Sequence, residues 1–413
     1  MTERDALARA VAERVARESY GKLVAFLAAR TRDVAAAEDA LAEAFAAALE
    51  TWPARGVPDN PQAWLLTAAR RKSIDAGRSR RRSEDAAPHL TLMAEEMESQ
   101  PHRDIPDERL ALMFACAHPS IDEALRAPLI LQTVLGFDAA AIASAFLVAP
   151  SAMGQRLVRA KAKIRGAGIP FRVPARDELS PRLDAVLQAI YAAYAEGWSD
   201  PAGTDPQRRN LAGEAIWLGR LVASLLPGEP EALGLLALML HAEARRAARR
   251  DAGGDFVPLG EQDTALWDST AMDEAETLLR RAGAMGVLGR FQLEAAVQSA
   301  HNVRRLAGSA DWRAILALYD ALFALTASPV VAINRAVALA ETAGAAAGLS
   351  ALDELAADPR LAQHQPYWAA RAELLARCGR IAQADEAYEQ AIGLEADPAI
   401  RRFLLRRRAR RET

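Results

Sequence analysis

The sequence has little cysteine and no long apolar run. Its two cysteines, Cys116 and Cys378, lie far apart among 413 residues. This usage fits a reducing compartment in which neither cysteine is bridged. No uninterrupted apolar stretch reaches about 18 residues, so we expect no transmembrane helix. The charged N-terminal segment lacks the apolar core of a secretory signal, and together these absences predict a cytoplasmic protein without membrane contact.

The signatures of catalysis and metal binding are missing as well. The sequence contains no glycine-rich phosphate loop, no HExxH motif and no nucleophile elbow. Its six histidines are scattered. Cys116 and His118 form a lone C-x-H pair, which offers too few ligands for zinc, and we interpret them as a packed turn before Pro119. The sequence therefore predicts a protein that is not an enzyme, with no catalytic residues, no metal site and no cofactor.

Alanine, by contrast, is very abundant, in long segments shared with leucine, arginine and glutamate. Such segments favour helices, and runs of β-branched residues that would favour strands are few. A chain of 413 residues is long enough for two or three domains. We therefore predict an all-α protein with more than one domain.

Positive charge is concentrated locally, although the formal net charge of the chain is only -3. Residues 70–82, RRKSIDAGRSRRR, contain seven basic residues and one acidic residue. Residues 149–165, APSAMGQRLVRAKAKIR, contain five basic residues and no acidic one. Two segments of this kind indicate two contact points on a polyanion, and solvated helix faces are the alternative.

Residues 138–164 have the pattern of a helix-turn-helix. A short helix with Asp138 as its N-cap is followed by the turn LVA and by a second helix over residues 150–164. The expected shared core is Ile142, Phe146, Val148, Met153 and Leu157. Early residues on the outer face of the second helix are placed to reach base edges, and its later cations to meet phosphates. This outer set is Ser151, Gln155, Arg156, Arg159, Lys161 and Lys163.

The N-terminal part is predicted to hold two helical segments separated by a proline-marked break. The first ends near Trp52, and the break PARGVPDNPQAW follows. Asn60 is the expected N-cap of the next helix, with Pro61 at its first position. Residues 83–107 are polar, acidic and proline-marked, which predicts a linker.

From about residue 175 the composition changes to alanine- and leucine-rich helices with little clustered charge. Residues 328–364 and 365–400 are predicted to be two antiparallel helix pairs with a period of roughly 34 residues, as in tetratricopeptide units. Repeats of this type stack into a solenoid that binds partners more often than it catalyses. A plain helical bundle is the alternative. Further helices of this kind are expected to be packed by Trp217, Leu221, Leu225, Leu233 and residues 236–240.

The order of these elements resembles that of an RNA polymerase sigma factor of the extracytoplasmic-function group. The string DVAAAEDALAEAFAAALETW is similar to the family's polymerase-binding helix. The string NPQAWLLTAARRKSIDAGRSRRR is similar to the helix that contacts and melts the -10 element. In this family a second domain carries the helix-turn-helix that reads the -35 element.

The resemblance implies roles for particular residues. The residues at core polymerase-binding positions are Asp39, Leu41, Glu43, Phe45 and Trp52. Those implied for the -10 element are Asn60, Trp64, Arg70, Arg71, Lys72, Asp75, Arg78 and Arg80. The outer face of the helix over residues 150–164 is implied for the -35 element.

Strings such as FACAHPSI and FLVAPSAMGQRLVRAKAKI resemble one subgroup of these factors, which carries a C-terminal extension similar to tetratricopeptide repeats. The implied domains are residues 1–82 for polymerase and the -10 element, 83–107 as linker, 108–174 for the -35 element, and 175–413 as the extension. Expected partners are bacterial core RNA polymerase, promoter DNA and a protein bound by the repeats. The extension is expected to regulate the factor or to dock a partner. A one-component helix-turn-helix transcription regulator with a helical-repeat sensor is the alternative function.

Overall fold

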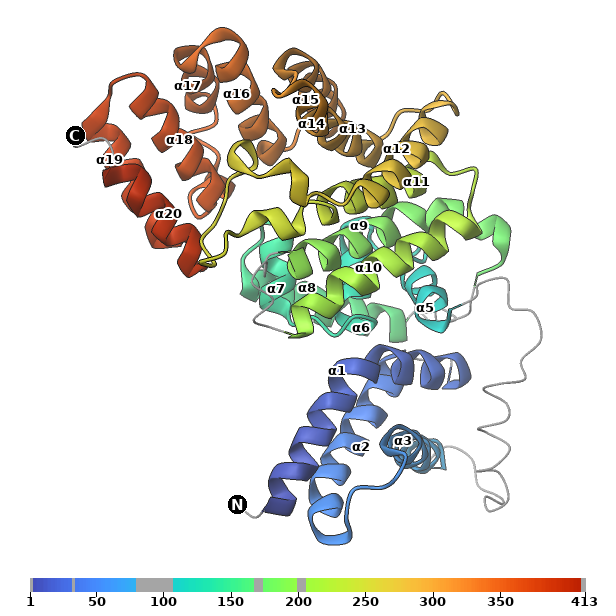
Figure 1. The fold of residues 1–413 in the computed structure, drawn as a ribbon. Coiled ribbons are helices and arrows are strands. Elements are labelled where there is room, and N and C mark those ends of the chain that lie inside the picture. The colour runs from blue at the N-terminus through green and yellow to red at the C-terminus, as the bar shows by residue number, and fades with distance from the viewer. Residues whose placement is uncertain (1–2, 32–33, 79–106, 167–173, 199–205, 410–413) are drawn as a thin grey trace. The chain divides into compact units, whose positions relative to one another are not determined.

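The computed structural model describes residues 3–31, 34–78, 107–166, 174–198 and 206–409 (Figure 1). The predicted all-α class is confirmed. Within the described residues the only β pairing is an isolated bridge between Arg250 and Phe256. Contacts divide the chain into two compact units, Met1–Ala193 and Tyr194–Thr413. No single described helix is long and apolar enough to cross a membrane.

Three helices open the N-terminal unit: α1 (Glu3–Thr31), α2 (Val34–Arg55) and α3 (Pro61–Arg78). Each packs on the other two (Figure 1). Asn60 caps α3 as predicted, since its Oδ1 accepts the backbone N–H of Ala63 at 3.0 Å and Pro61 is the first helical residue. Gln62 of α3 donates to Ser19 Oγ of α1 at 2.7 Å, which fixes the start of α3 against α1.

Four further helices follow in the same unit: α5 (Glu108–Cys116), α6 (Glu123–Thr133), α7 (Ala139–Ala145) and α8 (Pro150–Gly166). Asp138 caps α7 as predicted, accepting the N–H of Ala141 at 2.7 Å. The chain bends by 109° between α7 and α8, with Leu147 in the left-handed region at φ 52°. Of the predicted shared core, Ile142, Met153 and Leu157 are buried, and Phe146 and Val148 are half-buried.

Helix α9 (Ser180–Trp198) begins in the N-terminal unit and runs past its boundary. The helices after it are α10 (Pro206–Leu225), α11 (Pro230–Glu243), α12 (Ser269–Gly283), α13 (Arg290–Asn302), α14 (Arg304–Ala307), α15 (Trp312–Thr326), α16 (Pro329–Ala343), α17 (Ala345–Asp353), α18 (Gln365–Arg377), α19 (Ile381–Leu394) and α20 (Pro398–Ala409). From α15 onward each helix packs on the next (Figure 1). The helix pairs predicted over residues 328–364 and 365–400 correspond to α16 with α17 and to α18 with α19.

One core prediction in this part is wrong. Trp217 was expected to pack between helices, but its side chain is 42% exposed. Its neighbours Leu218 and Val222 are buried instead. The phase of α10 therefore points Trp217 away from the interior, a detail that residue type alone could not reveal.

Glu231 of α11 caps the N-terminus of α13. Its carboxylate accepts the backbone N–H groups of Phe291 at 2.9 Å and Gln292 at 3.0 Å. A Cβ atom at Gly289 would lie only 2.2 Å from Glu231 Cδ, so the absence of a side chain there makes room for the carboxylate. The carboxylate satisfies donors that a helix start leaves unpaired.

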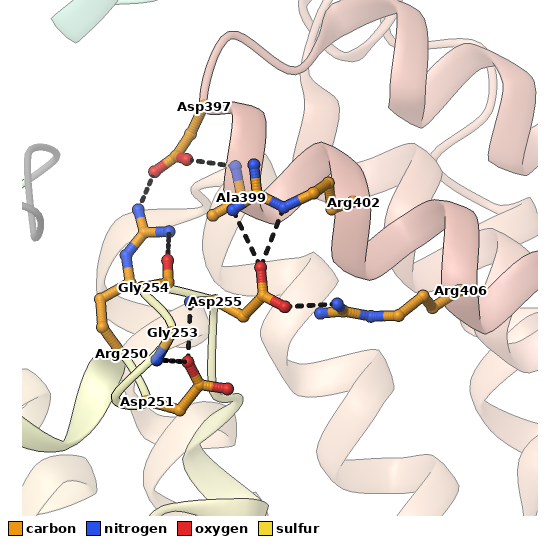
Figure 2. A network of polar contacts seen from close by, with 9 residues as sticks. All are labelled: Arg250, Asp251, Gly253, Gly254, Asp255, Asp397, Ala399, Arg402 and Arg406. Atoms are coloured by element: carbon orange, nitrogen blue, oxygen red, sulfur yellow. Dashed lines mark hydrogen bonds and ion pairs between the residues drawn. The ribbon is translucent and has the colours of Figure 1, made fainter.

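The segment over residues 250–261 makes polar contacts with α20, the last helix, and with the residue just before it (Figure 2). Asp255 accepts from Arg402 at 2.9 Å and also from Arg406, while Arg250 pairs with Asp397. The ring of Phe256 meets that of Phe403 edge-on at 5.4 Å. We call this segment the acidic clasp, because its carboxylates hold the arginines of α20.

Candidate nucleic-acid interface

The outer face of α8 is polar and basic. The side chains of Ser151, Gln155, Arg156, Arg159 and Lys163 are all exposed. Arg159 Nε donates to the backbone oxygen of Gln155 at 3.3 Å, one turn earlier. The structure therefore places five of the six predicted residues on the solvent side of one helix.

The inner face of α8 explains why this orientation is fixed. Met153, Leu157 and Ala160 are buried at helical spacing, and α8 packs on α6 and α7. Turning the helix would bring Arg156 or Arg159 into this apolar layer, and burying an unpaired charge is costly. The basic face must therefore point outward.

Lys161 is the sixth predicted residue, and its position differs. It is half-buried, and its Nζ lies 2.7 Å from Glu38 Oε2 of α2. Its ammonium group already has a carboxylate partner within the N-terminal unit. One N–H donor of Lys161 is therefore used inside the N-terminal unit.

Val158 is a residue that the sequence analysis missed. It is 69% exposed in the middle of the outer face of α8, one turn from Gln155 and Ala162. Its helical phase carried the signal, because at about 100° per residue Val158 lies about 100° from Leu157 and about 140° from Met153, away from the buried stripe. Val158 adds an apolar contact surface to a face that is otherwise polar.

The residues predicted for the -10 element lie along α3 and just before it. Asn60 is exposed and engaged as the N-cap. Trp64 is half-buried, and its ring meets Trp52 of α2 edge-on at 5.6 Å. Arg70 is half-buried and Arg71 is exposed. Three more members belong to α3, but their side chains are outside the described part of the chain, as is the whole of the fourth: Lys72, Asp75, Arg78 and Arg80.

The residues predicted to bind polymerase divide into two groups on α2. Asp39 and Glu43 are exposed one turn apart, and Phe45 is half-buried. Leu41 and Trp52 are buried in the helical core. In this structure these two side chains hold α2 against its neighbours and present no surface to a partner.

Leu49 was also missed by the sequence analysis. It is 46% exposed on α2, ten residues after Asp39 and six after Glu43, and about one turn after the half-buried Phe45. Leu49 and the accessible part of Phe45 add apolar surface to a helix that also exposes Asp39 and Glu43. Such a composition suits contact with a basic and apolar partner surface.

Burial shifts the pKa of two side chains in the N-terminal unit, Tyr20 and Cys116. Burial, together with the nearby carboxylates of Glu38 and Asp39, raises the pKa of Tyr20 to about 12. Burial also raises the pKa of the Cys116 thiol. Both groups stay protonated at neutral pH, so they add no charge to the interface.

The Cys116 and His118 pair forms the turn that the sequence indicates. Cys116 ends α5 and is buried, and His118 Nδ1 accepts the backbone N–H of Ser120 at 3.1 Å. Among the described residues no three His, Cys, Asp or Glu side chains are grouped to hold a metal ion. The imidazole thus contributes a turn hydrogen bond.

One known protein family matches the segment that contains most of α1 and all of α2 and α3. Residues 15–83 match the Sigma-70 region 2 family. This match supports a sigma-factor role in transcription directed by RNA polymerase. Residues 182–283, from α9 through α12, match a family of unknown function, DUF6596.

Similarity to a curated protein extends over most of the chain. The sequence is 37% identical over 372 residues to an uncharacterized protein of Rhizobium meliloti (strain 1021), and the match covers 88% of this chain and 87% of that protein. The chain belongs to the same family as this Rhizobium meliloti protein. No solved structure matches the chain.

Proposed function

We propose that this chain is a sigma factor of the extracytoplasmic-function type, which binds bacterial core RNA polymerase in the cytoplasm and selects promoters through two separate DNA contacts. The observation that carries the proposal is the combination of a Sigma-70 region 2 match at residues 15–83 with the outward basic face of α8. The first supplies the link to polymerase, and the second supplies a second DNA contact on the same chain.

The polymerase contact is assigned to the exposed face of α2. Asp39 and Glu43 are positioned to meet cations of the partner, and Leu49 and the accessible part of Phe45 to pack on its apolar surface. Leu41 and Trp52 act one layer below, by holding this face in place.

The -10 contact is assigned to α3 and the segment after it. A sigma factor must stabilise a single strand, which needs cations for the phosphates and an aromatic or polar surface for an unstacked base. Arg70 and Arg71 supply cations, and the half-buried ring of Trp64 lies at the start of the same helix. Lys72, Asp75, Arg78 and Arg80 complete the proposed set.

The -35 contact is assigned to α7 and α8 as a helix-turn-helix. Gln155 and Ser151 are placed in the first half of α8, where a recognition helix meets base edges. Arg156, Arg159 and Lys163 neutralise phosphates, and Lys161 joins them once its pair with Glu38 opens. Binding should then weaken steeply as salt rises.

The C-terminal unit is proposed to be a tetratricopeptide-like regulatory or docking domain. The successive packing of α15 to α20 supports a repeat architecture, whose extended surfaces suit protein partners. Autoinhibition of the DNA-binding helices and docking of a separate protein are the two forms this role can take. Deleting the C-terminal unit tests the first form. Autoinhibition predicts that the truncated factor is hyperactive, whereas an inactive truncated factor would show that the unit is required.

Transcription in vitro tests the whole proposal. Core RNA polymerase is incubated with a pool of promoter fragments, with and without the protein. New start sites that depend on the protein, with a shared upstream sequence, are the expected result. Tight binding of duplex promoter DNA by the protein alone, without polymerase-dependent starts, would instead favour a one-component regulator.

A further inference from the structure

The solvent-facing side of α12 carries opposite charges at its two ends. Asp273 and Glu274 lie in the first half of the helix, and Arg280 and Arg281 lie in its last turn. At about 100° per residue, all four lie within about 60° of the exposed Thr277 between them. The opposite side of the helix is buried through Met272, Ala275, Leu278 and Ala282. The exposed side therefore changes from acidic to basic along its length.

Most of these charges have no counter-charge inside the C-terminal unit. Among the described residues, none forms an ion pair with Asp273, Arg280 or Arg281. Arg280 Nη2 donates to Thr277 Oγ1 at 3.3 Å, which is a neutral contact. Glu274 does have a partner, because Arg220 Nη2 of α10 donates to its Oε2 at 2.8 Å, but the Glu274 side chain stays 37% exposed. The surface thus presents both signs of charge to solvent.

Large apolar side chains are exposed on the same surface. The turn over residues 284–288 follows α12 and exposes Met285, Val287 and Leu288, the last two by 62% and 64%. Trp217, which is 42% exposed, lies on α10 one turn before Arg220. Exposed apolar groups that are collected in this way mark interaction surfaces, and tryptophan and methionine are enriched in them.

The relative direction of α10 and α12 places these apolar groups at opposite ends. Arg220 of α10 meets Glu274 of α12. Glu231, the second residue of α11, lies shortly after the end of α10, and it accepts the backbone N–H of Phe291 just beyond the 284–288 turn. The C-terminal ends of α10 and α12 therefore lie together. Trp217 is then beside the start of α12, and the 284–288 turn lies beyond its end.

The 284–288 turn is held in one conformation by hydrogen bonds. The buried Gln292 donates from its Nε2 to the backbone oxygen of Val287 at 2.8 Å. Met285 donates its backbone N–H to the oxygen of Ala282 at 3.1 Å, and Gly286 takes the left-handed conformation at φ 72°. An ordered turn loses little conformational entropy when a partner binds it.

We propose that this surface is an interface between two copies of this chain, related by a two-fold axis beside Thr277. Antiparallel packing of the two α12 helices places Asp273 opposite Arg280 of the second copy. It also places Glu274 opposite Arg281 of the second copy. A two-fold contact requires one surface that is complementary to itself, and the charges of α12 have this property.

The apolar residues follow the same symmetry. Helix α10 lies on the Glu274 side of α12, because Arg220 pairs with Glu274. Met285 lies on that side too, since Ala284 still has helical dihedral angles and Met285 is about 80° from Thr277 in the direction of Glu274. The rotation exchanges the two ends of α12 and keeps the side, so Met285 of the second copy meets Trp217.

A second copy fits this surface better than a partner with charge of one sign. An acidic partner would be repelled at Asp273, and a basic partner at Arg280 and Arg281. In the two-fold arrangement every one of these charges faces its opposite. The interface lies wholly in the C-terminal unit and does not rest on the proposed sigma-factor function.

Sedimentation velocity of the full-length protein tests the interface, from submicromolar to submillimolar concentrations. A reversible change from monomer to dimer is expected as the concentration rises. Trp217→Ala should weaken the dimer by at least about tenfold, as for a tryptophan at the centre of an interface. Its thermal unfolding midpoint should stay that of the wild type, because the side chain is exposed.

Charge reversal tests the register of the two helices. Asp273→Arg places an arginine opposite Arg280, and Arg280→Asp places an aspartate opposite Asp273, so each variant alone should dimerise at least about tenfold more weakly. An equal mixture of the two variants should recover the dimer, because the arginines of one then face the aspartates of the other. Arg313→Asp, at an exposed arginine of α15, is the matched control and should dimerise as the wild type does.

Three results would overturn the proposal. The first is a protein that stays monomeric at every concentration. The second is a dimer that neither Trp217→Ala nor the charge reversals weaken. The third is a mixture of the two reversed variants that stays monomeric. If circular dichroism shows that a reversed variant does not fold, Trp217→Ala decides alone.

Discussion

The guanidinium of Arg182 donates to the backbone oxygen of Phe114 at 3.2 Å. Arg182 lies near the start of α9 and is 3% exposed, and Phe114 is buried in α5. Leu183, Val186 and Ile190 of α9 are buried as well. Helix α9, which follows α8, is therefore part of the core of the N-terminal unit, whereas the sequence predicted a domain end near residue 174.

This relationship predicts where the chain can be cut. A fragment of residues 1–174 lacks α9 and should unfold at lower denaturant concentration than a fragment of residues 1–198. In the longer fragment, Arg182→Ala should cost about 2 kcal/mol, because a buried carbonyl loses a charged donor. Urea unfolding followed by circular dichroism gives both values. Equal stability of the two fragments would show that α9 does not support the N-terminal unit.

The proposed phosphate contacts on α8 predict a change in salt dependence. Arg159→Ala and Lys163→Ala should each weaken promoter binding by the polymerase complex for all sequences alike, and reduce the slope of log affinity against log salt by about 1. Arg313→Ala, at an exposed arginine of α15, is the matched control and should leave the slope unchanged. Filter binding at several salt concentrations measures these slopes.

Val158 predicts a contact with a thymine methyl group. Apolar side chains in the major groove recognise the C5-methyl of thymine, and Val158 is exposed between the polar residues of α8. In promoters selected by the wild type, replacing one thymine of the upstream element by deoxyuridine should weaken binding several-fold, by about 1 kcal/mol. Val158→Ala should bind both promoters equally. If wild-type binding ignores every such replacement, Val158 does not read a methyl group.

An exposed and a buried leucine of α2 predict two different mutant phenotypes. Leu49→Asp should weaken capture of core polymerase without changing the unfolding midpoint, because the side chain is exposed. Leu41→Ala should cost about 3 kcal/mol of stability, as expected for a cavity in a helical core. Pull-down with core polymerase and thermal unfolding distinguish the effects. A Leu49→Asp variant with full polymerase affinity would exclude this face from the contact.

The acidic clasp predicts that the C-terminal unit loosens in acid. Hydrogen bonds from Arg406 and Arg402 lower the pKa of Asp255. A carboxyl group with a lowered folded-state pKa stabilises the fold above its ordinary pKa of about 4 and loses that contribution as the pH falls below it. Hydrogen exchange in α20 should therefore speed up below pH 4. Asp255→Asn should exchange faster at neutral pH and lose this acid dependence.

Local signals in the sequence were reliable where a side chain bonds to the backbone a few residues further along the chain. Asn60 and Asp138 cap their helices as predicted, because a short side chain with an oxygen acceptor suits an unpaired helix start wherever that helix lies. The basic face of α8 followed from the same kind of local regularity. Met153, Leu157 and Ala160 recur at helical spacing on the buried side, so Arg156, Arg159 and Lys163 had to point outward.

Burial depends on what packs against a helix, and there the sequence was less informative. Leu41 and Phe45 have similar apolar character, yet Leu41 is buried in the core and Phe45 remains half-buried. Trp217 is exposed although its residue type favours the interior. The neighbours that decide these positions come from other helices, whose angles no periodicity specifies.

The sequence by itself determined the helical class, the caps and the phase of the basic helix, because each depends on residues within a few positions of one another. The tertiary structure decided which arginines have counter-charges. Arg402 and Arg406 meet Asp255, which lies about 150 residues away in the chain, whereas Arg245 meets the amides of Gln298 and Asn302 and the ring of Trp267. Charge pairing is a matter of distances of a few ångströms between side chains, and only the folded chain sets these distances.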